Sequence, residues 1–280
     1  MTENSPKEMS FDYEIDSVEI REVYESNLDE EFKLINEIVD EYPYIAMDTE
    51  FPGTVSEPKG NLTPNECYFR TIKKNVNSKK IIQLGLTFFD ENGRLPTCKT
   101  DKYCIWQFNF REFNLEEDDY VEASIDMLRK NGIDFEKFNN QGVDAIEFAK
   151  LLIPSGAVLN ENVTWVGFHC GMDFGYLIKL LTCRKIPETQ KEFLQLLNTF
   201  CLNIYDVKQM MRFTKFIGGG LEELGKKLEL KRIGSTHQAG SDSLLTCCAF
   251  RKLKHECFAG SVGVYAGSLY SLDVYRTQNP

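Results

Sequence analysis

Two acidic residues separated by one residue, Asp48 and Glu50, follow the apolar run 44–47. Side chains two apart on a strand point to the same face, so both carboxylates are expected to converge on one point. A buried strand that ends in two acids has a cost of desolvation and repulsion unless a cation lies between them. The pair alone is weak evidence, because many such pairs are surface residues or helix caps.

Two further acids stand where helices are expected to begin. Asp173 follows the apolar run 163–168, and Asp242 lies five residues after His237 in the first turns of another helix. Taken singly, each acid is explained by the helix dipole or by capping. A lone histidine in a loop is likewise more often incidental than catalytic. The occurrence of all five residues in this order favours a catalytic site over five unrelated structural roles.

Four carboxylates with a nearby histidine predict a phosphodiesterase centre that binds two divalent cations. Hard oxygen ligands suit Mg²⁺ or Mn²⁺, and two such ions clamp the scissile phosphate during an in-line displacement. Because imidazole exchanges a proton near neutral pH, His237 is the expected general base. With only three histidines, the chain does not support a multi-histidine metal centre.

The hydrophobic pattern predicts an α/β fold with a mixed sheet flanked by helices on both faces. The expected strands cover residues 44–47, 81–89, 104–110, 163–168 and 203–207. The expected helices cover residues 27–41, 118–131, 143–152, 173–182, 188–198, 206–213, 220–228 and 239–256. Residues 79–110 are expected to form a hairpin with a polar tip, and 54–80 a polar loop with room for a helix.

The length of 280 residues and a hydrophobic content of 42% suit one large globular domain. We expect this domain to span residues 16–270, between a flexible acidic tail at 1–15 and a second tail at 271–280. No apolar run approaches the roughly 20 residues of a membrane span, and the polar start lacks the features of a secretory signal. We therefore expect an intracellular protein without a membrane partner. Nine cysteines without a Cys-x-x-Cys pair fit free thiols.

The net charge of −11 argues against nonspecific coating of nucleic acid. The charge is uneven, however: residues 1–50 carry 16 acids and three bases, whereas residues 204–254 carry ten bases and five acids. A local basic groove can still bind one RNA strand. The simpler explanation for most of these lysines is a solvated helix face.

The arrangement of the five residues resembles the exonuclease motifs of the DEDD superfamily in its histidine-containing branch. The surrounding sequence is more specific, and from about residue 16 to about residue 270 it resembles the Caf/Pop poly(A) ribonucleases, catalytic subunits of the CCR–NOT complex. The blocks that carry this resemblance are MDTEFPG, QLGLTFF, GFHCGMDFGYLIKLL, YDVKQMM and GGLEELGKKLELKRIGSTHQAGSDSLLT.

The resemblance implies an RNase H-like fold and stepwise removal of adenylates from the 3′ end of mRNA, with release of AMP. It implies that Asp48, Glu50 and Asp242 hold the tighter cation, and that Asp173 completes the shell of a second cation that Asp48 also contacts. It places Phe51 in contact with the terminal base or sugar and makes His169 a candidate for a substrate contact. It further implies a scaffold protein and a companion nuclease as partners, in the cytoplasm and the nucleus.

Three alternatives stay open at this point. The same metal chemistry would serve a related exonuclease that acts on other RNA or DNA ends. Some family members have lost ligands and act only as adaptors, although all five key residues are present here. The simplest alternative is an α/β protein whose acids are only caps and surface charges.

Overall fold

The computed structural model describes residues 11–57 and 60–272. These residues contain a six-stranded mixed sheet. The strands are β1 (Val18–Val23), β2 (Tyr44–Glu50), β3 (Gln83–Phe89), β4 (Tyr103–Asn109), β5 (Thr164–Gly167) and β6 (Asn203–Asp206). They lie in the order β1-β4-β3-β2-β5-β6. The central strands β2, β3 and β4 pair antiparallel, and the outer strands join them in parallel. The predicted hairpin over 79–110 is thereby confirmed.

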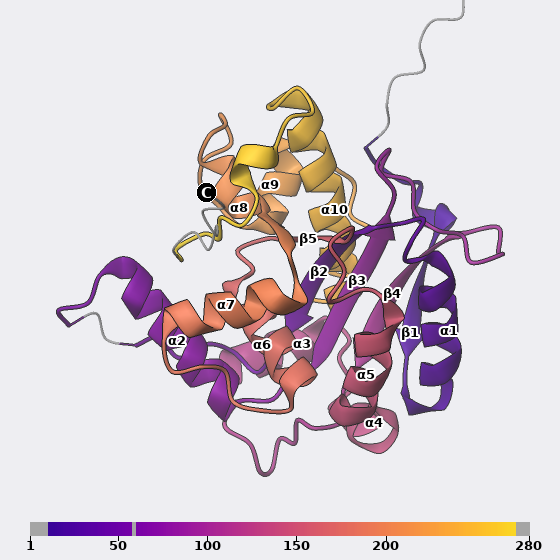
Figure 1. The fold of residues 1–280 in the computed structure, drawn as a ribbon. Coiled ribbons are helices and arrows are strands. Elements are labelled where there is room, and N and C mark those ends of the chain that lie inside the picture. The colour runs from indigo at the N-terminus through magenta and orange to yellow at the C-terminus, as the bar shows by residue number, and fades with distance from the viewer. Residues whose placement is uncertain (1–10, 58–59, 273–280) are drawn as a thin grey trace, which may run out of the picture.

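Helices cover both faces of the sheet, as the sequence predicts. They are α1 (Leu28–Ile38), α2 (Pro64–Ser78), α3 (Glu122–Lys130), α4 (Phe135–Gln141), α5 (Ala145–Leu152), α6 (Gly171–Thr182), α7 (Gln190–Phe200), α8 (Val207–Met211), α9 (Leu221–Lys227) and α10 (Ala239–Glu256). In Figure 1, α8, α9 and α10 lie together at the top, and α2 and α7 lie at the left. Among the described residues, no helix combines the length and apolar character needed to cross a membrane.

Successive side chains of β2 point to opposite faces of the sheet, and each face is covered by its own layer of helices. Ile45 and Met47 pack into one hydrophobic cluster, with side chains from α1, α2, α5, α6 and α7. Ala46, between them, packs into a second cluster with α8, α9 and α10. A strand that is buried on both faces reads as a continuous apolar run, which is how the sequence reads at this position. The side chain of Asp48 lies on the same face as that of Ala46, toward α10.

The segment 54–80, expected as a polar loop with room for a helix, contains the fifteen-residue helix α2. Its start is fixed by a reciprocal capping box between Thr63 and Glu66. The helix is hard to recognise from its sequence because polar side chains, including Thr71 and Asn75, are buried on its inner face. The usual apolar stripe is therefore interrupted.

Two elements have no counterpart in the sequence prediction. β1 is an edge strand with charged residues between its apolar ones, and its partner β4 lies more than 80 residues further along the chain. α4 has only seven residues, of which Phe135 and Phe138 are buried. Neither element is long enough for a clear periodic signal.

The predicted tail at 1–15 lies partly outside the described residues, but its last part is packed. The Tyr13 hydroxyl donates to the carbonyl oxygen of Gly93 at 2.5 Å and accepts from Arg251 Nη1 at 2.9 Å. The packed domain therefore begins before residue 16, which corrects the expected boundary. Most of the second predicted tail, 271–280, lies outside the described residues.

Gly85 in β3 allows α10 to approach the sheet closely. It lies opposite Asp48 in the register of β2 and β3. A methyl group at residue 85 would lie 1.9 Å from the carbonyl oxygen of Ala239, in the first turn of α10. α10 therefore begins directly over the strand end that carries Asp48, and this brings Asp242 toward it.

Gly85→Ala is therefore expected to lower the free energy of unfolding by about 3 kcal/mol, because the colliding atoms are backbone and must shift. Urea denaturation measures the change. Gly263→Ala is the matched control, since a methyl group there has no atom of the described residues within 4 Å. Equal stability of the two variants would show that α10 does not depend on the close approach at Gly85.

Candidate active site

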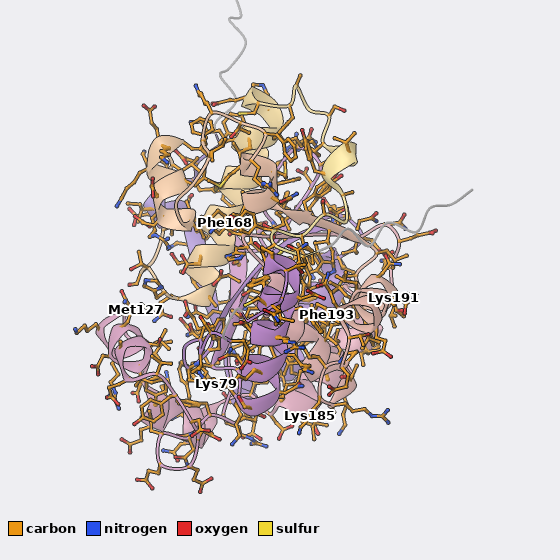
Figure 2. The ribbon with its side chains drawn as sticks, turned by 90° about the vertical axis from the view of Figure 1, so that its left-hand side faces the viewer. Lys79, Met127, Phe168, Lys185, Lys191 and Phe193 are labelled. Atoms are coloured by element: carbon orange, nitrogen blue, oxygen red, sulfur yellow. The ribbon has the colours of Figure 1, made fainter. Side chains whose placement is uncertain are left out.

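A cavity of about 850 Å³ opens at the end of β2. Every site residue predicted from the sequence lines it: Asp48, Glu50, Phe51, His169, Asp173, His237 and Asp242. Phe168, labelled in Figure 2, also lies on its wall. The structure thus brings together residues that are separated by nearly 200 positions in the chain.

The start of α10 is held by side chains of the sheet rather than by its own cap residue. Gln83 Oε1 accepts from the amide of Ala239 at 3.2 Å, and Gln107 Oε1 accepts from the amide of Gly240 at 2.8 Å. Both glutamines also donate through Nε2 to Gln238 Oε1, at 3.1 and 2.7 Å. Because β3 and β4 satisfy the first amides of the helix, its first turn has one fixed position.

His237 and Asp242 are placed by this fixed turn. The His237 amide donates to Asp242 Oδ2 at 3.0 Å, and its backbone has a left-handed φ of +57°. Ligand atoms of His237, Asp242 and Glu50 all lie within 4.8 Å of one another. His237 is exposed to the cavity while the two acids are buried, so its ring can meet solvent and substrate.

Asp173 is held from β2 on the other side of the site. Thr49, between the two acids of the strand, donates to Asp173 Oδ1 through its amide at 3.0 Å and through its hydroxyl at 2.5 Å. The start of α6, which carries Asp173, is in turn held by Asp206 at the end of β6. Asp206 accepts from the amides of His169 and Cys170 at 2.9 and 3.3 Å.

The pKa of each of the four carboxyl groups is raised. Burial is the largest cause for Asp48 and Glu50, and the nearby charges of Asp242 and then Asp173 raise both pKa values further. Burial also raises the pKa of Asp173 to about 6, although the hydrogen bonds from Thr49 oppose the shift. The pKa of Asp242 is raised by burial. Ionising all four groups is therefore unfavourable without a compensating positive charge.

Arg232 contributes one positive charge to this cluster. Its Nη1 lies 2.7 Å from Asp242 Oδ1, and its Nε donates to Glu222 Oε2 at 2.9 Å. The Arg232 charge lowers the pKa of Asp242, but the guanidinium is shared with Glu222 and cannot neutralise four carboxylates. The remaining negative charge and the all-oxygen donor set are what hard divalent cations require.

The rings of Phe51, Tyr68 and His169 line another part of the cavity. Phe51 stacks on Tyr176 with ring centroids 5.1 Å apart. The His169 ring stacks on Tyr68 at 5.1 Å and meets the edge of Tyr270 at 4.9 Å. Flat faces of this kind accept nucleobases by stacking.

His169 has a further property that suits a ligand. Burial lowers its pKa, which favours the neutral ring, and its Nε2 is buried without a hydrogen-bond partner among the described residues. Lys208 lies nearby, with Nζ 5.1 Å from the ring centroid of Tyr270. A neutral ring beside a lysine can contact both the polar and the anionic parts of a nucleotide.

Several residues of the site were not found from the sequence. Thr49, Asp206 and Glu222 received no role, and Arg232 was noticed only as one of the basic residues in 204–254. Thr49 and Asp206 did carry a signal, because one is a polar residue inside a buried strand and the other an acid between a strand and a helix. No local signal connects Arg232 with Asp242.

Comparison with known proteins agrees with the geometry. The model of the CAF1 family ribonuclease matches residues 23–150. The chain is 55% identical over 272 residues to the probable CCR4-associated factor 1 homolog 7 of Arabidopsis thaliana, covering 96% of this chain and 99% of that protein. It is 43% identical over 244 residues to the poly(A) ribonuclease pop2 of Schizosaccharomyces pombe, covering 87% and 71%.

Solved structures agree as well. Pop2p of S. pombe in its Mg²⁺- and Mn²⁺-bound form matches with a TM-score of 0.86 and 42% identity, covering 90% of this chain and 99% of that one. A structure of the yeast NOT1 MIF4G domain co-crystallised with CAF1 matches with a TM-score of 0.76 and 29% identity, covering 92% and 99%. The expected RNase H-like fold is confirmed. The chain therefore belongs to the CAF1 family of ribonucleases.

Proposed function

We propose that this ribonuclease removes adenylates one at a time from the 3′ end of mRNA poly(A) tails, by hydrolysis assisted by two divalent cations, and releases AMP. One observation carries the proposal: four carboxylates with raised pKa values and an exposed histidine share one cavity. A relative at 43% identity, the S. pombe poly(A) ribonuclease, supports the choice of substrate.

The four carboxylates fit two cations of the Mg²⁺ or Mn²⁺ type, and the match to the Mg²⁺- and Mn²⁺-bound Pop2p supports this choice. Asp48, Glu50 and Asp242 would hold one ion, and Asp173 with Asp48 the other. Bound cations would neutralise the carboxylates, polarise the scissile phosphate and stabilise the charge on the leaving oxygen. Thr49 and Arg232 keep two of the ligands in position through their bonds to Asp173 and Asp242.

His237 acts as the general base by taking a proton from the attacking water at an imidazole nitrogen. The water oxygen forms a bond to the phosphorus of the last phosphodiester, and the bond from phosphorus to the 3′ oxygen of the preceding nucleotide breaks. That oxygen is protonated from solvent, so the shortened RNA keeps a 3′ hydroxyl. The terminal nucleotide leaves as AMP with its phosphate on the 5′ carbon.

Phe51 and His169 are proposed to contact the terminal nucleotide. The Phe51 face offers stacking, which by itself accepts any base. His169 lines the same cavity, and its buried Nε2 has no hydrogen-bond partner within residues 11–57 and 60–272. Preference for adenine rests on kinship with the S. pombe poly(A) ribonuclease.

We further propose that the protein works in a CCR–NOT-type complex, with a scaffold subunit and a companion nuclease, in the cytoplasm and the nucleus. The match to CAF1 co-crystallised with the NOT1 MIF4G domain supports the scaffold partner. Pull-down of a NOT1 MIF4G domain by the purified chain tests that part separately.

The activity is tested with 5′-labelled RNAs that end in adenylates, uridylates or cytidylates, beside a matched DNA, in Mg²⁺ and in Mn²⁺. The expected result is a ladder that shortens one nucleotide at a time from the 3′ end and stalls where the adenylates stop. Equal rates on every substrate would replace the proposal by a general exonuclease. Intact RNA under both metals would favour an adaptor.

A further inference from the structure

The inner face of α2 carries a buried polar stripe, defined as Thr71, Asn75 and Lys79, outside the carboxylate site. The three residues are spaced by four, so they follow one side of the helix to its C-terminal cap. Asn75 is 1% exposed and Lys79 is 3% exposed. Buried polar groups at this depth require partners, so the stripe has to be paired with something specific.

The partner of the polar stripe is the backbone of residues 53–57, which leads away from β2. Asn75 Oδ1 accepts from the amide of Val55 at 2.8 Å, and Asn75 Nδ2 donates to the carbonyl oxygen of Val55 at 2.8 Å. Thr71 Oγ1 accepts from the amide of Glu57 at 3.1 Å. Four residues of a helix rise about 6 Å and two residues of extended chain about 6.6 Å, so the two periods match.

Lys79 completes the stripe at Gly53. Its Nζ donates to the carbonyl oxygen of Gly53 at 2.6 Å, and in the described part of the chain no carboxylate forms an ion pair with it. Gly53 has a φ of +82°, and its amide donates to the carbonyl oxygen of Phe51 at 2.7 Å. Lys79 therefore holds the tight turn that directly follows the catalytic strand.

This turn belongs to the wall of the cavity. Phe51 and Thr54, on either side of the turn, both line the cavity, as does Tyr68 from α2 itself. In Figure 2, α2 is the purple helix at the centre, with Phe168 of the cavity above it and Lys79 near its lower end. The helix thus connects the polar stripe with the side of the cavity that lies away from α10.

We propose that Lys79, supported by Asn75 and Thr71, is a positioning residue that fixes the wall formed by Phe51 and Thr54 against the terminal nucleotide of the RNA. The proposal rests on the assignment of Phe51 as a substrate contact. Lys79 does not touch the carboxylates, so it acts on binding of the nucleotide and not on the hydrolytic step.

Lys79→Met tests the proposal, because methionine keeps an unbranched apolar stem of similar length and removes the donor to Gly53. KM and kcat are measured on adenylate-tailed RNA at saturating Mn²⁺. KM is expected to rise about tenfold, while kcat changes less than about twofold, as expected for lost ground-state and transition-state binding alike. A residue that only stabilises the fold would lower the active fraction and leave KM unchanged.

Lys80→Met is the matched control. Lys80 is the next residue and the substitution removes the same charge, but Lys80 Nζ, on a side chain that is 41% exposed, forms an ion pair with Asp118 Oδ2 at 3.0 Å. Its KM is expected to stay within about twofold of the wild-type value. An equal rise in both variants would reduce the effect to general attraction between lysines and RNA, and would overturn the proposal.

Thr71→Val provides a second variant with nearly unchanged shape, should Lys79→Met fail to fold in a melting experiment. It removes the acceptor for the Glu57 amide, and KM is expected to rise about threefold. The proposal would be contradicted if Lys79→Met or Thr71→Val folds and keeps the wild-type KM. It would also be contradicted if either variant loses kcat while KM stays constant. If the wild-type protein itself leaves adenylate tails intact, the proposed function fails, which is a distinguishable result.

Discussion

Asp48→Asn is expected to give a folded protein whose rate of degradation of adenylate-tailed RNA is at least about a thousandfold lower than that of wild type. Asparagine has the same shape but lacks the negative charge at the centre of the cluster, where Asp242, Asp173 and Glu50 all act on Asp48. Cation binding is therefore weakened at both proposed positions. Single-turnover rates over a range of Mn²⁺ concentrations measure the loss and show whether excess metal restores activity.

The same variant is expected to be more stable than wild type when divalent cations are removed by a chelator. The folded-state pKa values of the four carboxyl groups lie above their usual values, so protonation favours the folded state. For Asp173, this contribution is fully present below the usual value of 3.8 and is lost as the pH rises through about 6. The melting temperature of metal-free wild type should therefore fall as the pH is raised through this range.

At about pH 8, the free energy of unfolding of Asp48→Asn should exceed that of metal-free wild type by on the order of 1 kcal/mol, because the variant lacks one buried carboxyl group whose ionisation is disfavoured in the folded state. Saturating Mg²⁺ should reverse the order, since the ions bind only the folded wild-type site. Asp101→Asn, at an exposed position, is the control and should change neither quantity. If the melting temperature of wild type does not respond to pH, chelator or cation, the buried carboxylates do not destabilise the metal-free fold and this explanation is wrong.

The four carboxylates could be found from the sequence because each lies at a junction with a strong local signal. Alternation along β2 puts Asp48 and Glu50 on one face whatever the rest of the fold does. Asp173 and Asp242 follow apolar strands or open apolar helices, so their neighbours mark them. The mixed sheet was predictable for the same reason, since its central strands are apolar runs between turns.

What the sequence leaves hidden are the contacts made by partners far apart in the chain. Arg232 meets Asp242 only because α9 and the start of α10 are folded onto the sheet. Gly85 reads as an ordinary strand residue, and its role depends on the 1.9 Å that a methyl group would leave to Ala239. The inward polar stripe of α2 even misleads, because buried Asn75 and Lys79 are typical of exposed positions.

His237→Asn is expected to lower kcat by about 10² to 10³-fold, the usual contribution of a general base. Asparagine suits the position because His237 has a φ of +57°, and asparagine tolerates the left-handed region better than most residues. The backbone bond from residue 237 to Asp242 Oδ2 does not involve the side chain and is retained. The variant therefore removes the imidazole while it preserves the turn that places Asp242.

If His237 acts as a base and not as a cation ligand, His237→Asn and Asp48→Asn should change different properties of the protein. His237→Asn should keep the stabilisation by Mg²⁺ and the wild-type KM, and lose only the chemical step, because the ring is exposed and the carboxylates remain. His255 lies in the last turn of α10, with its ring tilted against that of Phe11, and His255→Asn is the control that should behave as wild type. If His237→Asn instead loses its response to Mg²⁺, the imidazole is a cation ligand, as its closeness to Glu50 and Asp242 allows, and the base must be sought elsewhere.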